Sequence, residues 1–214
     1  MVKEIRVTIL TAFLTLFSFS FGCNTVKQPT EVMIGNQLWM TENLNVDKFQ
    51  NGDNITYAKS FEEWQLAAEN KIPAYCYYNF DEVYRTTYGK LYNWYCVDDS
   101  RGLAPKGYHI PSNDEWQILI DYLGGNKIAG GKLQAKPNLN SVNNEDWYFM
   151  AKAGGRCGYY TGFYELEANG YWWSSTVADE GSAWLRFIKL SDREVYKANY
   201  YKSGGYSVRC VKDY

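Results

Sequence analysis

Residues 88–123, YGKLYNWYCVDDSRGLAPKGYHIPSNDEWQILIDYL, contain the clearest helix start in the chain. Ser112 can accept a hydrogen bond from the free amides of the next turn, and Glu115 lies three residues further on, as in a capping box. The apolar residues that follow recur at helical spacing: Trp116, Leu119, Ile120 and Leu123. Two glycines at 124 and 125 can adopt the left-handed conformation that ends a helix. The sequence predicts an amphipathic helix here.

The same stretch contains His109, the only histidine of the chain, close to a serine and several acids. A general base also needs an oriented partner and a nucleophile. Ser112 is already explained as the helix cap, and His109 beside Ile110 and Pro111 has the setting of a packed strand residue. We therefore predict that His109 packs in the structure, and we assign no catalytic residue.

Shorter patterns predict the remaining elements. They are a hairpin over 31–45 with its turn at Gly35 and Asn36, a helix of about ten residues from the capping pair Ser60 and Glu63, a strand over 73–78, a polar loop over 79–87, a short helix over 91–97, a loop over 124–147, and strands over 149–160, 171–176, 183–190, 194–199 and 206–212. A first half with helices and an antiparallel second half predict an α+β single domain with two main helices and a twisted, mostly antiparallel sheet.

The first residues have the pattern of an export signal. Lys3 and Arg6 precede an uncharged apolar run over 7–21, which is too short to span a membrane. The run ends in Gly22 and Cys23, and a small residue before a cysteine at this place resembles a bacterial lipobox. We predict a lipoprotein signal peptide over 1–22, lipid attachment at Cys23, a polar tether over 23–30 and one domain over 31–214. An ordinary signal peptide with a free Cys23 is the alternative.

The charge and the cysteine spacing bear on nucleic-acid binding, disulfide formation and metal binding. Without residues 1–22 the net charge is −3, and no cluster of Lys and Arg stands out, so we expect no nucleic-acid partner. Cys76, Cys96, Cys157 and Cys210 can oxidise in an exported protein, and the sequence does not choose among their three pairings. Metal binding is disfavoured, because no pair has the CxxC spacing and one imidazole is available.

Six segments of the chain resemble one family. They are IGNQLWMTENLN (34–45), NG (51–52), YGKLYNWY (88–95), GLAPKGYHIPSNDEW (102–116), YWWSST (171–176) and YSVRCVKD (206–213). In this order they resemble the Fibrobacter succinogenes major paralogous domain. The resemblance implies a C-type-lectin-like fold of the formylglycine-generating-enzyme type, and a bacterial surface or secreted protein of the outer membrane or cell surface. It implies no particular activity.

The residues favour neither copper-dependent oxidation nor lectin-type calcium binding, two activities of that wider superfamily. A copper-dependent oxidase of the formylglycine-generating kind would use a cysteine pair near the C-terminal strands, and Cys210 has no neighbouring cysteine there. Lectin-type calcium binding would use a Glu-Pro-Asn or Gln-Pro-Asp triplet, which the chain lacks. Oxygen-rich segments at 98–99, 143–146 and 179–180 are more typical of solvated loops, so we predict no cofactor and keep calcium as an alternative.

Two aromatic clusters are candidates for ligand binding. The residues are Tyr159, Tyr160, Phe163 and Tyr164 in the first cluster, and Tyr200 and Tyr201 in the second. Loops rich in Tyr and Gly give a rigid contact surface at low entropic cost, although packing of rings across strands would use the same residues. We expect a non-enzymatic surface module that binds an extracellular glycan or protein. A structural component of a surface appendage is the first alternative, and an enzyme that uses a carboxylate pair is the second.

Overall fold

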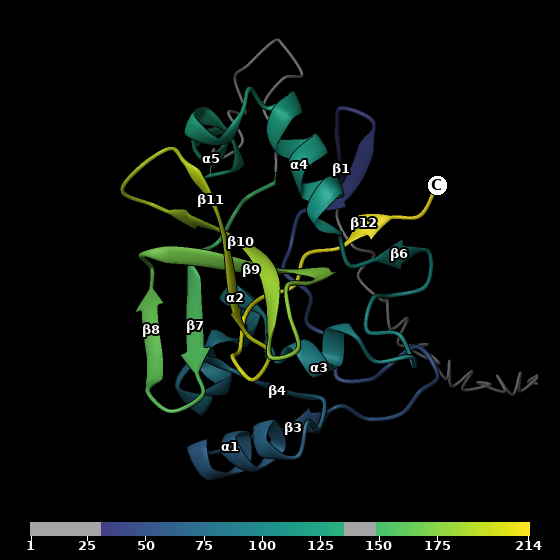
Figure 1. Ribbon diagram of the computed structural model, residues 1–214, viewed down its shortest axis with the longest axis vertical. Helices are drawn as coiled ribbons and strands as arrows, with labels where there is room; N and C mark the ends of the chain where they lie inside the picture. Colours follow the sequence, from purple (N-terminus) through teal and green to yellow (C-terminus); the bar gives the residue numbers. More distant parts are fainter. Residues whose placement is uncertain (1–30, 135–148) are drawn as a thin grey trace, which may run out of the picture.

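The computed structural model describes residues 31–134 and 149–214, and these form one α+β domain (Figure 1). The signal peptide, Cys23 and the tether lie outside the described residues, as does the segment 143–146. In the described part of the chain, no helix is long and apolar enough to cross a membrane. The predicted α+β class is confirmed, although the strands form four small sheets and not one.

The N-terminal hairpin pairs with the C-terminus of the chain. Strand β1 (Glu31–Ile34) turns at Gly35 into β2 (Gln37–Met40), which pairs with β12 (Val211–Lys212), and β12 pairs with β6 (Tyr108–His109). Gly35 has a φ of +63°, which the predicted turn requires. The last predicted strand, over 206–212, is shorter than expected and pairs as a strand only at its end.

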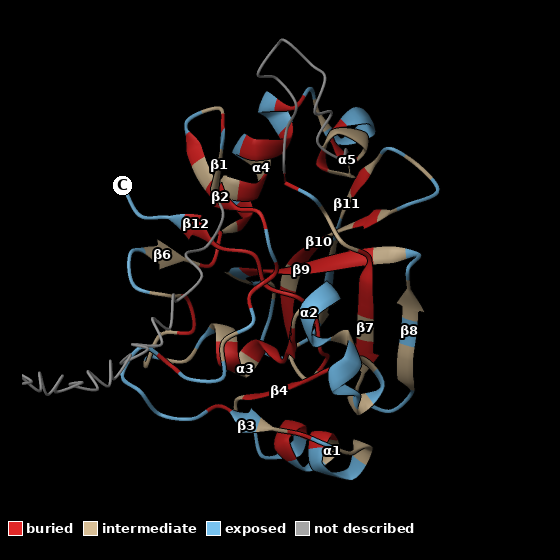
Figure 2. Cartoon of the chain, turned by 180° about the vertical axis from the view of Figure 1, so that it is seen from behind, coloured by how far each residue is buried: buried red, intermediate tan, exposed pale blue. Residues whose placement is uncertain are grey.

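A second sheet crosses the middle of the molecule. Its order is β11 (Val195–Tyr201), β10 (Ser182–Lys189) and β9 (Asn169–Val177), all antiparallel. Trp172 and Trp173 are consecutive on β9 and are both fully buried, one in each of two different apolar clusters. Alternating side chains of a strand point to opposite faces, so this sheet has core on both sides (Figure 2).

The predicted helix after Ser112 is present as α4 (Asn113–Tyr122). Ser112 Oγ accepts from the Glu115 amide, and the Glu115 carboxylate accepts from the Ser112 amide, so the capping box is complete. All four predicted apolar residues of this helix are buried, and the Trp116 ring lies 4.9 Å from the Trp39 ring. The Gly124 and Gly125 φ angles are +100° and +91°, as predicted for the helix end.

The helix that follows α4 was not predicted. Residues 124–147 read as a loop, yet α5 (Asn126–Gln134) is helical and packs against β11. Gly130 and Gly131 lowered its helical signal, but they are required by packing. A Cβ on Gly130 would lie 2.6 Å from the Glu194 carbonyl oxygen and 2.7 Å from that of Arg193.

The remaining elements lie at the other end of the domain. The helix α1 (Phe61–Glu69) starts at Ser60 as predicted, but the Glu63 carboxylate accepts from Lys59 N, so only half of this capping box is formed. A small sheet follows with order β3 (Thr56–Tyr57), β4 (Ala74–Cys76) and β5 (Leu91–Tyr92), and β5 leads into α3 (Trp94–Val97). The predicted loop 79–87 is wrong: it contains the turns η1 (Tyr78–Phe80) and η2 (Glu82–Tyr84) and the helix α2 (Arg85–Tyr88).

Arg209 lies at the centre of the molecule and bonds to segments that are far apart in the sequence. Its side chain is fully buried and donates to the Met40 carbonyl at 3.2 Å, to the Phe149 carbonyl and to Asn43 Oδ1 at 2.7 Å. Burial lowers the pKa of Arg209 to about 9. Its hydrogen-bond acceptors are carbonyl oxygens, which offset part of the cost of burying the charge.

Candidate functional site

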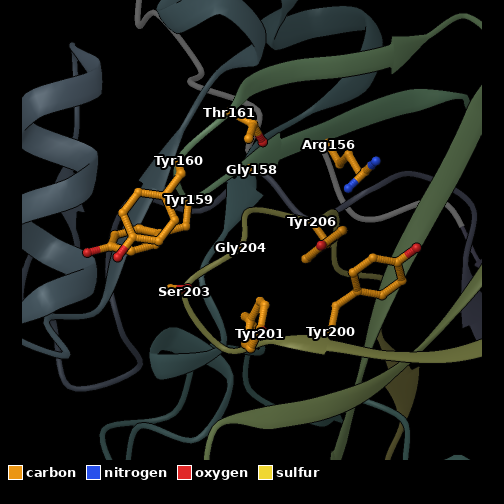
Figure 3. Close-up of a pocket in the computed structure, with 10 residues that line it drawn as sticks. All are labelled: Arg156, Gly158, Tyr159, Tyr160, Thr161, Tyr200, Tyr201, Ser203, Gly204 and Tyr206. Carbon is orange, nitrogen blue, oxygen red and sulfur yellow. The ribbon is translucent and has the colours of Figure 1, made fainter.

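The described part of the chain contains a pocket of about 600 Å³ between two loops of the second half (Figure 3). One loop is the hairpin between β7 (Gly154–Gly158) and β8 (Gly162–Leu166), and the other follows β11. The pocket is lined by Arg156, Gly158, Tyr159, Tyr160, Thr161, Tyr200, Tyr201, Ser203, Gly204 and Tyr206. Residues more than 35 positions apart in the sequence therefore form one surface.

Backbone hydrogen bonds fix the two loops relative to each other. The Cys157 amide donates to the Gly205 carbonyl at 2.9 Å, and the Gly205 amide donates to the Cys157 carbonyl at 2.8 Å. The next residue, Tyr206, exchanges a similar pair of bonds with Tyr92. The floor of the pocket is thus bonded through its backbone to strand β5, so the shape of the pocket does not depend on side chains alone.

The tyrosines divide into a buried floor and an exposed rim. Tyr206 is buried, and its ring lies 5.6 Å from the ring of Tyr200. Tyr160 and Tyr201 expose 74% and 76% of their surface, so they contribute little to the core. Rings that are this exposed at the mouth of a concave pocket are available for contact with a ligand.

Tyr159 lies between the pocket and helix α1. Its hydroxyl donates to Glu69 at 3.1 Å, and its ring centroid is 3.9 Å from that of Tyr160 at an angle of 62°. The contact with Glu69 orients Tyr159 from outside the hairpin. One exposed ring of the rim, Tyr160, is thereby supported by a neighbour that is itself held in place.

Arg156 is the only charged residue of the lining. Its Nε donates to Glu165 Oε2 at 2.8 Å, and the Tyr171 hydroxyl donates to the same oxygen at 2.6 Å. Burial opposes ionisation of Glu165, but the bonds from Tyr171 and Arg156 lower its pKa, so the carboxylate is ionised at neutral pH. The guanidinium also lies 5.7 Å from the Tyr200 ring centroid, on the pocket side of the hairpin (Figure 3).

The structure brings together four of the six predicted ligand-binding residues, namely Tyr159, Tyr160, Tyr200 and Tyr201. Phe163 instead packs between Tyr78 and Phe80, with ring centroids 5.0 and 4.8 Å away. Tyr164 bonds to the Thr161 carbonyl and lies beside Arg156, outside the lining. Phe163 and Tyr164 are consecutive on β8, so their side chains leave the strand on opposite faces, and neither lines the pocket.

Sequence reasoning missed Arg156, Thr161, Ser203 and Tyr206 as pocket residues. Arg156 precedes Cys157 in a glycine-rich strand, and nothing in its local pattern distinguishes it from a surface arginine. Ser203 and Gly204 stand in a glycine-containing segment after Tyr201, a pattern that predicts a turn and no ligand contact. Their place in the pocket follows from the pairing between residues 157 and 205, which has no local sequence signal.

His109 does not pack as predicted. Its side chain is 36% exposed and lies between two carboxylates, with Nε2 at 2.5 Å from Glu115 Oε1 and Nδ1 at 2.8 Å from Asp213 Oδ1. Burial lowers the pKa of His109, but the bonds to Glu115 and Asp213 outweigh this and raise it. Ser112 Oγ donates to Glu115 and not to the imidazole, so these groups do not form a nucleophile–base pair.

Two of the oxygen-rich segments, 98–99 and 179–180, lie in the described part of the chain, and Asp98 and Glu180 line one pocket together with Lys71 and Lys202. Asp99 pairs with Arg101 at 2.8 Å, and Asp179 accepts from the amides of Gly181 and Ser182 within its own turn. Among the described residues, no group of three or more His, Cys, Asp or Glu side chains is placed to hold a metal ion. The four cysteines of the domain are buried free thiols.

Fold and pocket together define a single-domain α+β protein with an aromatic pocket built by two C-terminal loops. The model of the Fibrobacter succinogenes major domain matches residues 32–212, and the chain belongs to this family. No curated protein and no solved structure matches the chain.

Proposed function

We propose that this protein is a lipid-anchored module of the bacterial cell surface that binds a glycan in the pocket of Tyr160, Tyr201 and Arg156. The observation that carries the proposal is the convergence of two aromatic loops in one concave pocket. The C–H faces of a sugar ring can stack on tyrosine rings, while its hydroxyl groups bond to the phenol, hydroxyl and guanidinium groups around them.

The size of the pocket favours a glycan over a folded protein as the ligand. A pocket of about 600 Å³ lies within the range of small-ligand sites, about 300–1,000 Å³. A stable protein partner would bury roughly 800 Å² on each side, mostly on flatter surface. The exposed rings of the rim, Tyr160 and Tyr201, offer further contacts to a glycan that extends beyond the pocket.

The proposed location depends on the sequence of the first residues. The charged start, the apolar run and Cys23 support export and lipid attachment, with the tether leading into β1. Metabolic labelling with a palmitate analogue would tag the natural chain and leave Cys23→Ser unlabelled. Equal labelling of both would remove the anchor from this proposal.

We also propose that the domain is C-type-lectin-like, of the formylglycine-generating-enzyme type. The support is the segment Pro111, Ser112, Glu115 and Trp116 at the start of α4, which resembles the helix entry of that superfamily. In the structure, Ser112 and Glu115 form the capping box of α4, and Trp116 is buried in the core. The structure offers no support for the chemistry of such enzymes here. Cys210 is buried next to Arg209, and burial raises the pKa of its thiol to about 12, which disfavours the reactive thiolate.

The test of the function is a glycan array probed with the Cys23→Ser chain after removal of residues 1–22. We expect binding to at least one class of glycan, lost in Tyr160→Ala/Tyr201→Ala. A protein array processed in parallel detects the other ligand class. Binding to protein alone would overturn the glycan assignment, and absence of binding on both arrays would overturn the proposed function.

The second candidate function is a structural component of a surface assembly. One observation favours it: Ile118 and Tyr122 lie one turn apart on α4 and expose 46% and 54% of their surface, and the Tyr122 ring lies beside Gly35. Exposed apolar residues on one helix face are typical of contact sites. Sedimentation of the mature chain would show discrete oligomers or fibres if this function holds.

A further inference from the structure

Two of the buried cysteines lie together beneath the aromatic pocket. Cys76 is on β4 and Cys157 is on β7, 81 positions apart in the sequence, and both belong to one small apolar cluster with Trp64 and Leu91. Burial and the neighbouring Cys157 thiol both raise the pKa of Cys76, and the Cys157 thiol donates to the Gly158 carbonyl at 3.6 Å. Such proximity is what a disulfide requires.

The other two cysteines have different surroundings. The Cys96 thiol donates to the Ala74 carbonyl at 3.3 Å, and Cys210 lies next to the buried Arg209. Both belong to the larger central cluster, and in the described residues no hydrogen bond joins the Cys96 thiol to the Cys210 thiol. The geometry therefore supports one bond, between Cys76 and Cys157, with Cys96 and Cys210 left reduced.

We propose that Cys76 and Cys157 are oxidised to a disulfide that locks the pocket hairpin onto the β4 sheet. One S–S bond forms from two thiols, and the two electrons and two protons pass to a disulfide oxidant of the thiol-exchange class. The modification is independent of which ligand the pocket binds. It concerns how the pocket is held, because Cys157 also carries the two backbone bonds to Gly205.

The position of the bond explains why it would act on the pocket. Arg156 and Gly158, the two neighbours of Cys157, both line the cavity. A cross-link at Cys157 would restrain the base of the hairpin, while Tyr159 and Tyr160 remain at its tip. It would also close a long loop, and cross-links that close long loops restrict the unfolded chain strongly.

The test is a peptide map of the chain refolded in a glutathione redox buffer, alkylated and cleaved with trypsin without reduction. We expect the peptides of Cys76 and Cys157 to be joined, and those of Cys96 and Cys210 to carry the alkyl label. The variants Cys96→Ala and Cys210→Ala should keep the bond. Free Cys76 and Cys157, or a bond to either other cysteine, would overturn the proposal.

Hydrogen exchange tests the effect on the pocket in the same preparation. Reduction, or the double variant Cys76→Ala/Cys157→Ala, should speed exchange at the Cys157 and Gly205 amides by at least about tenfold. The amides of α4, which lies in a different apolar cluster, serve as the internal control and should change less. Equal change in both regions would show a general loss of stability and contradict a local lock.

Discussion

Cys157 and Gly205 donate backbone hydrogen bonds to each other, at 2.9 and 2.8 Å, across the gap between the two aromatic loops. The space between them is closed: a Cβ on Gly205 would lie 3.0 Å from the Cβ of Cys157 and 3.0 Å from the Trp64 ring. The pocket therefore depends on a glycine that is not among its lining residues.

Replacement of this glycine should damage the pocket and the fold together. Gly205→Ala is expected to lower the free energy of unfolding by about 1–3 kcal/mol, because the added methyl group overpacks a filled site. Urea denaturation measures the change. Gly181→Ala is the matched control, since its Cβ would meet only Asp179 Oδ1 at 3.8 Å. Similar stability of the two variants would show that the contact at 205 is not restrictive.

The buried arginine should matter far more than a surface arginine. Arg209→Met removes the buried donor to the carbonyl oxygens of Met40 and Phe149 and leaves Asn43 Oδ1 with Trp172 Nε1, and we expect a loss of about 3 kcal/mol or more. Arg101→Met removes surface ion pairs to Asp53 and Asp99, and should cost much less than Arg209→Met, because solvent screens exposed ion pairs. Comparable losses measured by denaturant unfolding would contradict the central role of Arg209.

The single histidine gives the stability a defined dependence on pH. The folded protein raises the pKa of His109, so its contribution is complete below the unfolded value of about 6.5 and is lost as the pH rises through the folded value. The free energy of unfolding should fall in that window by up to about 1 kcal/mol, because the pair is partly exposed. In His109→Gln the decline should vanish. A decline of unchanged size in this variant would assign it to other groups.

The helix α4 could be predicted because all its signals are local. Ser112, Glu115 and the apolar spacing each act within a few residues, and the structure contains all of them. The helix α5 could not be predicted in this way. Gly130 reads as a helix breaker, whereas its lack of a side chain is what lets the helix lie against the turn at 193–194.

The candidate site, like the fold, was predictable only where the signal lies within a few residues of sequence. Aromatic composition identified the two clusters, but it could not separate Tyr160, which is exposed at the pocket, from Phe163, which fills a gap between Tyr78 and Phe80. That difference depends on strand alternation and on long-range pairing. The role of Arg156 likewise follows from Glu165 and Tyr200, which reach it through the fold.

The central claim is that the exposed tyrosines of this pocket bind the ligand. It is tested most directly by calorimetric titration of the best array glycan into the mature chain and its variants. We predict that Tyr201→Ala weakens binding at least about tenfold, the equivalent of 1.4 kcal/mol, while leaving unfolding unchanged. Tyr214→Ala, an equally exposed tyrosine outside the pocket, should bind like the natural chain. Undiminished affinity in Tyr201→Ala and in Tyr160→Ala would contradict the account.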